Sequence, residues 1–254
     1  FPRWETLPYE ATAPHVGLIA RRMNALHRIH GASAARVVTS VAALIQRLMP
    51  VETFLHSLLR LDVGGPIERH VLTGGLLRLG YRRVSVVEIP GEFSIRGGIV
   101  DIFSTAYGDP LRAEFLGETI ESLRLFDPST QKSTRKLERA VILPAREYVR
   151  LDEAAEALAP IAPDAEWRAP DLYPRMDTLF DYFSGSPLLV LDQPAVLTHS
   201  AADLWERIDD GYLRNSERDA SFPYPSPERL FLTWQNVTDA TTDRSRLALE
   251  PLAA

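Results

Sequence analysis

Several residue types are scarce or missing in this chain of 254 residues. Cysteine is absent, which excludes disulfides, thiolate nucleophiles and cysteine metal ligands and suits a reducing compartment. No stretch approaches the length of apolar residues that a membrane span needs, so none is expected. Lysine occurs only as Lys132 and Lys136, and neither follows a glycine. A phosphate-binding loop needs glycine amides and a lysine that reaches the phosphates, so this sequence contains no such loop of its own.

The polar residues form no catalytic constellation. His27 and His30 lie three residues apart, but no carboxylate or third histidine has a metal-ligand spacing from them. We therefore interpret them as surface histidines at the end of a helix. The segment FSGSP lacks the strand–elbow–helix setting that a hydrolase nucleophile needs. We expect no catalytic residue, no metal and no cofactor in this chain.

Charge is distributed unevenly along the sequence. Residues 1–65 hold seven basic and four acidic residues, and residues 66–150 hold thirteen and eleven. Residues 151–254 hold eight basic and nineteen acidic residues. Because acidic surfaces repel phosphate, the last third predicts a poor nucleic-acid surface. Any direct DNA contact would have to come from the first 150 residues, where the positive excess is slight.

The overall composition is that of an ordinary globular protein. Apolar residues make up 45% of the chain and charged residues 24%, which argues against disorder of the whole. The chain begins at Phe1, with neither an initiator methionine nor a signal sequence. We expect it to be a piece of a longer protein.

Hydrophobic periodicity predicts α/β character at both ends of the chain. The predicted helices are 14–30, 41–49, 66–80, 176–183 and 195–208, with another that opens at residue 151. The predicted strands are 35–40, 58–63, 188–191 and 230–234.

The middle of the chain predicts an antiparallel sheet instead. Short β-rich runs alternate there with turns marked by glycine and proline. The predicted strands are 82–88, 92–96, 99–103, 111–116, 120–126 and 137–143, with Gly97 and Gly98 in a hairpin turn. The predicted organisation is α/β over 1–65, an antiparallel insert over 66–150, and α/β again over 151–254.

One face of this predicted sheet combines charge with an apolar side chain. Alternation along the strand LRAEFL turns three apolar residues inward and leaves Arg112, Glu114 and Leu116 on the other face. In the strand EFSIR it places Arg96 on the polar side as well. Arginine pairs bidentately with carboxylates, so this face would suit a partner of complementary charge. The alternative interpretation is a solvated face with cross-strand ion pairs, each worth at most about 1 kcal/mol.

Four segments of the middle region resemble a known module. They are GYRRV, PGEFSIRGGIVDIF, PLRAEFLGETIESLRLFDPSTQKS and ILPAREY, and they closely resemble the module that bacterial transcription-repair coupling factors share with the excision-repair protein UvrB. The segments FPRWETLPYE and MDTLFDYF are more similar to the coupling factors, in their N-terminal UvrB-homology module, than to UvrB. The resemblance covers most of the chain and is weak after about residue 210.

The resemblance implies a fold and a binding function. The fold would be a degenerate, N-terminally truncated RecA-like parallel-sheet domain, interrupted by an inserted, mainly antiparallel UvrA-binding domain. The implied UvrA contacts are Arg96, Arg112, Glu114 and Leu116, the last of which stands where the family usually has a second aromatic residue. The implied function is recruitment of UvrA to stalled RNA polymerase in nucleotide excision repair, by a cytoplasmic module without catalysis of its own.

Two other functions remain open. The chain could be part of a UvrB-like ATP-dependent damage-loading helicase, which would require a Gly-Lys-Ser/Thr loop upstream of Phe1. It could also clamp the translocase motor of its parent protein in a resting state. The resemblance implies that the parent is an ATP-dependent DNA translocase, whose ATP, Mg²⁺, DNA and RNA polymerase contacts lie outside this chain. The expected partners of the chain itself are UvrA and other domains of the parent.

Overall fold

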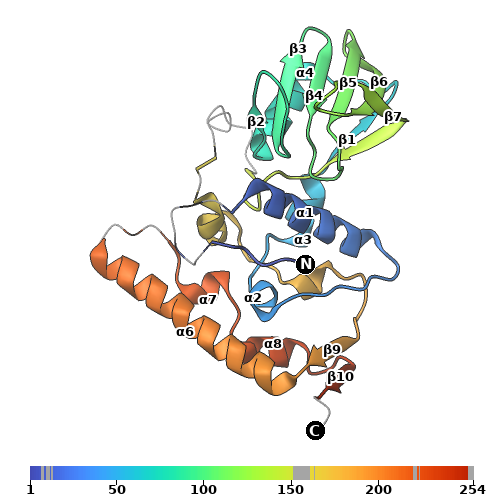
Figure 1. Cartoon of the computed structure of the whole chain (residues 1–254). Helices are drawn as coiled ribbons and strands as arrows, with labels where there is room; N and C mark the ends of the chain where they lie inside the picture. The colour runs from blue at the N-terminus through green and yellow to red at the C-terminus, as the bar shows by residue number, and fades with distance from the viewer. Residues whose placement is uncertain are drawn as a thin grey trace. The chain divides into compact units, whose positions relative to one another are not determined.

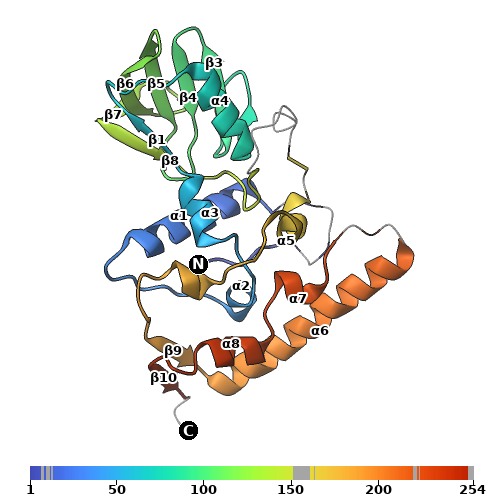
Figure 2. The same cartoon turned by 180° about the vertical axis from the view of Figure 1, so that it is seen from behind.

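The computed structural model of this chain describes residues 1–6, 9, 12, 14–150, 161–162, 164–219, 222 and 224–250. These residues form two compact units (Figures 1 and 2). The first unit comprises Phe1–Ala13, Arg28–Val51 and Pro163–Ala254, and the second comprises Pro14–His27 and Glu52–Ala162. The helix predicted to open at residue 151 lies outside the described residues.

The second unit is built on a six-stranded sheet with the order β2-β3-β4-β5-β6-β7 (Figure 1). Neighbours from β3 to β7 pair antiparallel, and β2 pairs parallel with β3. The strands are β2 Arg82–Arg83, β3 Glu92–Arg96, β4 Ile99–Ile102, β5 Leu111–Leu116, β6 Thr119–Phe126 and β7 Ser133–Leu137. A separate antiparallel pair joins β1 Leu59–Asp62 to β8 Arg139–Ile142.

One face of the six-stranded sheet is buried. Val100, Ala113 and Leu123 lie opposite one another on adjacent strands and form an apolar row across the sheet. Helix α4, Arg69–Arg78, runs alongside the sheet in both views and buries Leu72 and Leu76 (Figures 1 and 2). The alternation of apolar and polar residues therefore orients the sheet, because side chains along a strand point to opposite faces.

A glycine in α4 allows close helix–strand packing. A Cβ at Gly75 would lie 3.1 Å from a methyl carbon of Leu59 in β1. Glycine in a helix costs about 1 kcal/mol relative to alanine. Here the missing side chain lets the helix approach the strand.

A buried ion pair joins α1, Val16–Gly31, to the segment after β8. The side chain of Arg22 is 0% exposed and donates to Glu147 through Nε and through Nη2, the latter at 3.0 Å from Oε2. A charge removed from water requires a hydrogen-bonded counter-charge. The pair therefore constrains how this part of α1 packs within the second unit.

Helix α3, Val51–His56, directly precedes β1 in the sequence.

The first unit is mainly helical in the part that the structure describes. Its helices are α2 Val41–Leu44, η2 Ala165–Arg168, α5 Ala169–Leu172, η3 Leu179–Tyr182, α6 Pro194–Arg218, α7 Pro227–Leu230 and α8 Trp234–Ala240. Strands β9 Leu189–Asp192 and β10 Arg246–Leu249 pair parallel. Trp167 is buried at the centre of an aromatic cluster, with ring centroids 4.9 Å from Trp4 and 5.9 Å from Tyr9.

The fold is mixed α/β with mostly antiparallel sheets, which confirms the coarse prediction. Strands 92–96 and 111–116 have the predicted bounds. The strand predicted at 35–40 is wrong, because this stretch has no strand partner, and 230–234 forms a single bridge at Phe231. The helix predicted over 41–49 ends at Leu44, because the backbone N–H groups of Arg47 and Leu48 bond to the distant carbonyls of Leu230 and Asp177.

One more predicted helix differs from the structure, and two strands of the structure were not predicted. The helix predicted over 176–183 is a single 3₁₀ turn, Leu179–Tyr182, with a capping box at Thr178. Strands β7 and β10 were not predicted. Both are polar or exposed along their length, so they lack the alternation that marks a half-buried strand. Among the described residues, no helix is long and apolar enough to cross a membrane.

Replacing Glu147 with alanine should strongly destabilise the second unit. The change leaves the Arg22 guanidinium buried without its counter-charge, so we expect the free energy of unfolding to fall by about 3–5 kcal/mol. Arg139→Ala is the control, because it breaks an exposed pair with Asp62 at 4.0 Å and should cost at most about 1 kcal/mol. Urea denaturation of the variants measures both values, and equal effects would contradict the role given to Arg22.

Candidate functional site

The face of the six-stranded sheet opposite the buried one is polar, and we call it the open face. Its side chains lie in rows, because residues opposite one another on adjacent strands point to the same side of a sheet. One row is Ser94, Asp101, Arg112, Arg124 and Lys136, and the next is Arg96, Ile99, Glu114 and Ser122.

Asp101 lies at the centre of the open face and binds two arginines. Its side chain is 1% exposed. Arg112 donates from Nε to Oδ1 at 2.7 Å and from Nη2 to Oδ2 at 2.9 Å. Arg96 donates from Nη2 to Oδ2 at 2.7 Å. One buried carboxylate on β4 therefore joins arginines from both neighbouring strands.

Arg112 is held from several sides. Its guanidinium carbon lies 4.3 Å from the ring centroid of Phe126, a cation–π arrangement. Its Nη2 also donates to Oε1 of Gln131 at 2.9 Å. The hydrogen bonds to Asp101 raise the pKa of Arg112, and burial opposes this shift less strongly. The Arg112 side chain is 16% exposed, whereas that of Arg96 is 49% exposed.

Glu114 forms a second polar group one row away from Asp101. Its Oε2 accepts hydrogen bonds from Ser122 Oγ at 2.6 Å and from Arg124 Nη2 at 2.8 Å. Glu114 is thus bonded within the sheet and only partly accessible. Asp101 therefore pairs with Arg96 and Arg112, whereas Glu114 pairs with Arg124.

Leu116 is the accessible apolar residue of the group. It ends β5 opposite Thr119 and is 73% exposed. The pairing of β5 with β6 shifts after Glu114, which leaves Glu121 on β6 without a strand partner. Such a bulge increases the local twist of the strands. The sheet therefore presents Leu116 at the margin of the open face.

A loop covers the other end of the open face. Val87 packs with Phe103 and Phe126 in a buried cluster. Glu92 Oε2 accepts hydrogen bonds from the backbone N–H groups of Glu88 and Ile89, at 2.9 and 3.1 Å. The loop between β2 and β3 is thereby fixed over the apolar end of the face, and the Phe126 ring beneath Arg112 is part of this cluster.

The structure joins two of the predicted site residues and places the other two beside them. Arg96 and Arg112 meet on Asp101, Glu114 lies in the row of Arg96, and Leu116 follows on the same strand as Glu114. Sequence reasoning missed Asp101. The available signal was a single carboxylate inside the apolar strand segment IVDIF, beside two strands that each carry an arginine on the polar side.

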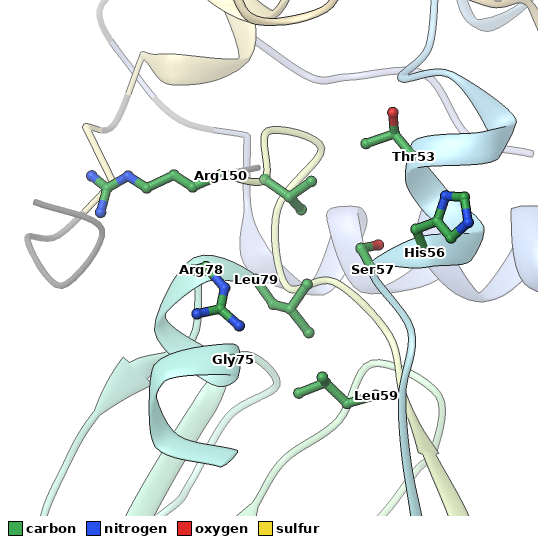
Figure 3. A pocket seen from close by; sticks show the side chains of 9 residues that line it. Thr53, His56, Ser57, Leu59, Gly75, Arg78, Leu79 and Arg150 are labelled. Atoms are coloured by element: carbon green, nitrogen blue, oxygen red, sulfur yellow. The ribbon is translucent and has the colours of Figure 1, made fainter. Parts of the chain in front are cut away.

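The second unit also contains a hollow of about 220 Å³ (Figure 3). Its lining includes Ser57 next to His56, but Ser57 Oγ donates to the carbonyl of Phe54 at 2.7 Å. The side chain of Arg150 extends away from the other labelled side chains in Figure 3. The Ser57 hydroxyl in this hollow is therefore bonded to the backbone. Within the described ranges, no group of three or more acidic or histidine residues could hold a metal ion.

Comparison with known proteins places these features in a family. Residues 59–148 match the family model of the UvrB interaction domain, and this range contains the whole six-stranded sheet. The chain is 31% identical to the transcription-repair-coupling factor of Myxococcus xanthus over 82% of its length, which is 20% of that relative. The corresponding protein of Bacillus subtilis is 36% identical over 63% of the chain and 14% of the relative. That of Escherichia coli is 34% identical over 57% of the chain and 13% of the relative.

The second unit therefore contains a UvrB interaction domain, a protein-binding class of domain. The chain as a whole belongs to the family of transcription-repair-coupling factors. It spans about a fifth of the length of the Myxococcus xanthus relative.

Arg112 and Arg96 should differ in what they contribute to stability. Arg112→Ala leaves Asp101 buried without its bidentate partner, so we expect the free energy of unfolding to fall by about 2–3 kcal/mol. Arg96→Ala removes one hydrogen bond from a half-exposed side chain and should cost about 1 kcal/mol or less. Chemical denaturation compares the two variants. Equal losses would show that Asp101 does not depend on Arg112.

Proposed function

We propose that this chain is a protein-binding module of a transcription-repair coupling factor and that its open face binds UvrA. The observation that carries the proposal is the joined pair Arg96 and Arg112 on Asp101, with exposed Leu116 nearby, inside the match to the UvrB interaction domain. UvrA is the partner that the family resemblance implies for this domain.

The chemistry of the open face suits a protein partner. Protein interfaces are enriched in arginine, and their strongest contacts are groups that lose water on binding. The Arg96 fork is half exposed and Leu116 is largely exposed, so both can be covered by a partner. Arg112 and Glu114 are more enclosed. Glu114 would support the contact surface, and Arg112 would add a smaller contact than Arg96 does.

The same face is a weaker candidate for binding nucleic acid. The two central rows carry four basic side chains, but Asp101 and Glu114 lie among them and accept hydrogen bonds from Arg96, Arg112 and Arg124. Phosphate binding depends on uncompensated positive charge. A partner with its own carboxylates and an apolar contact for Leu116 fits this mixture better than a nucleic-acid backbone.

The wider role follows from the family. In this proposal the module recruits UvrA to stalled RNA polymerase, and the first unit is part of a degenerate RecA-like domain. The parallel pairing of β9 with β10 supports that assignment of the first unit. The sequence has no Gly-Lys phosphate loop, which supports a module without catalysis. ATP, Mg²⁺, DNA and RNA polymerase would be bound by other parts of a cytoplasmic parent protein, whose remaining domains would be further partners.

Substitutions at Arg96 and Leu116 should weaken UvrA binding without unfolding the chain. We expect Arg96→Ala to cost about 1–3 kcal/mol of binding free energy, a loss typical of a charged interface contact. Leu116→Ala should cost about 1 kcal/mol through lost apolar area. Titration calorimetry of the chain against UvrA measures both. Leu116→Phe should bind more tightly, because the larger ring adds contact area.

Arg135→Ala is the matched control for the arginine substitution. Arg135 lies on β7, is exposed, and is one residue away from the open-face position Lys136, so it points to the other side of the sheet. Its removal should leave the affinity unchanged. If the wild-type chain gives no heat of binding at about 50 μM UvrA, its affinity is weaker than this range. That result would contradict the proposed function.

A further inference from the structure

Asp101 is too enclosed to contact a partner directly. Its side chain is 1% exposed, and both carboxylate oxygens accept hydrogen bonds from arginines. Any effect of Asp101 on binding must therefore pass through Arg96 and Arg112. The residue is well placed for this, because it lies on β4 between the strands that carry the two arginines.

The Asp101 carboxylate leaves part of each guanidinium available. Arg96 uses Nη2 for its bond to Asp101, and Arg112 uses Nε and Nη2 for its bonds to Asp101 and Gln131. No hydrogen bond from Nη1 of either arginine to another described residue is present. Arg112 is thus fixed in orientation and Arg96 is held at one nitrogen, while both keep donors for an incoming carboxylate.

Fixing these side chains in advance favours binding. An arginine that becomes ordered only on association loses rotamer entropy at that moment, which weakens binding. On the open face part of this loss occurs at folding, because Asp101 and the Phe126 ring already hold Arg112. Arg96 is held by one bond and would gain its second constraint from the partner.

We propose that Asp101 is a positioning residue of the docking face, which aligns Arg96 and Arg112 to receive a carboxylate group of the partner. The inference rests on the proposed function and deepens it, because it names the chemistry of the partner and the residue that prepares the site. Asp101 acts through the arginines and makes no contact with the partner itself.

Electrostatics and positioning predict opposite effects of Asp101→Asn on affinity. The substitution removes a negative charge, so a face that acted through its positive field alone would bind an acidic partner more tightly. If Asp101 positions the arginines, the variant should bind about tenfold more weakly, because both side chains must then be ordered on binding. The sign of the change separates the two accounts.

The experiment compares Asp101→Asn with Glu121→Gln in calorimetric titrations against UvrA. Glu121 is exposed on β6 and makes the same change in charge without contacting the arginines. We expect Glu121→Gln to bind as tightly as the wild type or up to about twofold more tightly. Circular dichroism must show that both variants are folded at the temperature used.

A second comparison tests whether Asp101 acts through Arg96. In an Arg96→Ala background, Asp101→Asn should weaken binding less than it does in the wild type, because one of the two side chains that it positions is gone. Fully additive effects in this cycle, or wild-type or tighter affinity of Asp101→Asn, would overturn the inference. If the wild-type chain itself does not bind UvrA, the proposed function fails first and the inference falls with it.

Arg96→Lys keeps the test decisive if Asp101→Asn does not fold. The lysine keeps the charge at an exposed position but lacks the planar fork that Asp101 orients. We expect an affinity loss of about fivefold or more. Wild-type affinity of Arg96→Lys would show that charge alone is needed there and would overturn the inference.

Discussion

The burial of one carboxylate determines the arrangement of the open face. Asp101 is almost inaccessible to water, and a buried charge is tolerated only when hydrogen bonds and a counter-charge replace its hydration. Arg112 supplies two bonds and Arg96 a third. The positions of both arginines therefore follow from a requirement of folding, and the surface that they form exists before any partner arrives.

The rest of the second unit keeps this arrangement in place. The apolar row Val100, Ala113 and Leu123 fixes the register of three neighbouring strands. A shift of one residue would turn Arg112 inward and Ala113 outward, which burial of the row forbids. Phe126 belongs to a buried cluster and supports the Arg112 guanidinium from below. Packing on one side of the sheet thus determines the chemistry presented on the other.

Sequence patterns were sufficient to predict the strands whose apolar and polar residues alternate. Strand Leu111–Leu116 alternates clearly, so its bounds and the outward direction of Arg112 and Glu114 could be predicted. The strand predicted at 35–40 failed because apolar character alone does not supply a neighbouring strand. Strand β7 escaped prediction because its pairing with β6 stabilises an exposed, polar segment. The presence or absence of a pairing strand decided both cases, and the residue pattern of a segment does not show this.

Four residues of the candidate site could be predicted from the sequence, but the ion pairs that join them could not. Arg96, Arg112, Glu114 and Leu116 were expected on one face, as cross-strand ion pairs or as an interface. The register shows which acid meets which arginine, with Asp101 paired to Arg96 and Arg112, and Glu114 to Arg124. A single sequence cannot give this pairing, because a shift of strand register would exchange the partners.

The central claim is that Asp101 holds the arginines before a partner binds, and arginine side-chain NMR of the free chain tests it most directly. The Nε–H of Arg112 donates to Asp101 at 2.7 Å from a largely covered side chain. It should therefore give a resolved signal at neutral pH that exchanges with water at least about tenfold more slowly than that of exposed Arg135. Exchange of Arg112 as fast as that of Arg135 would contradict the account.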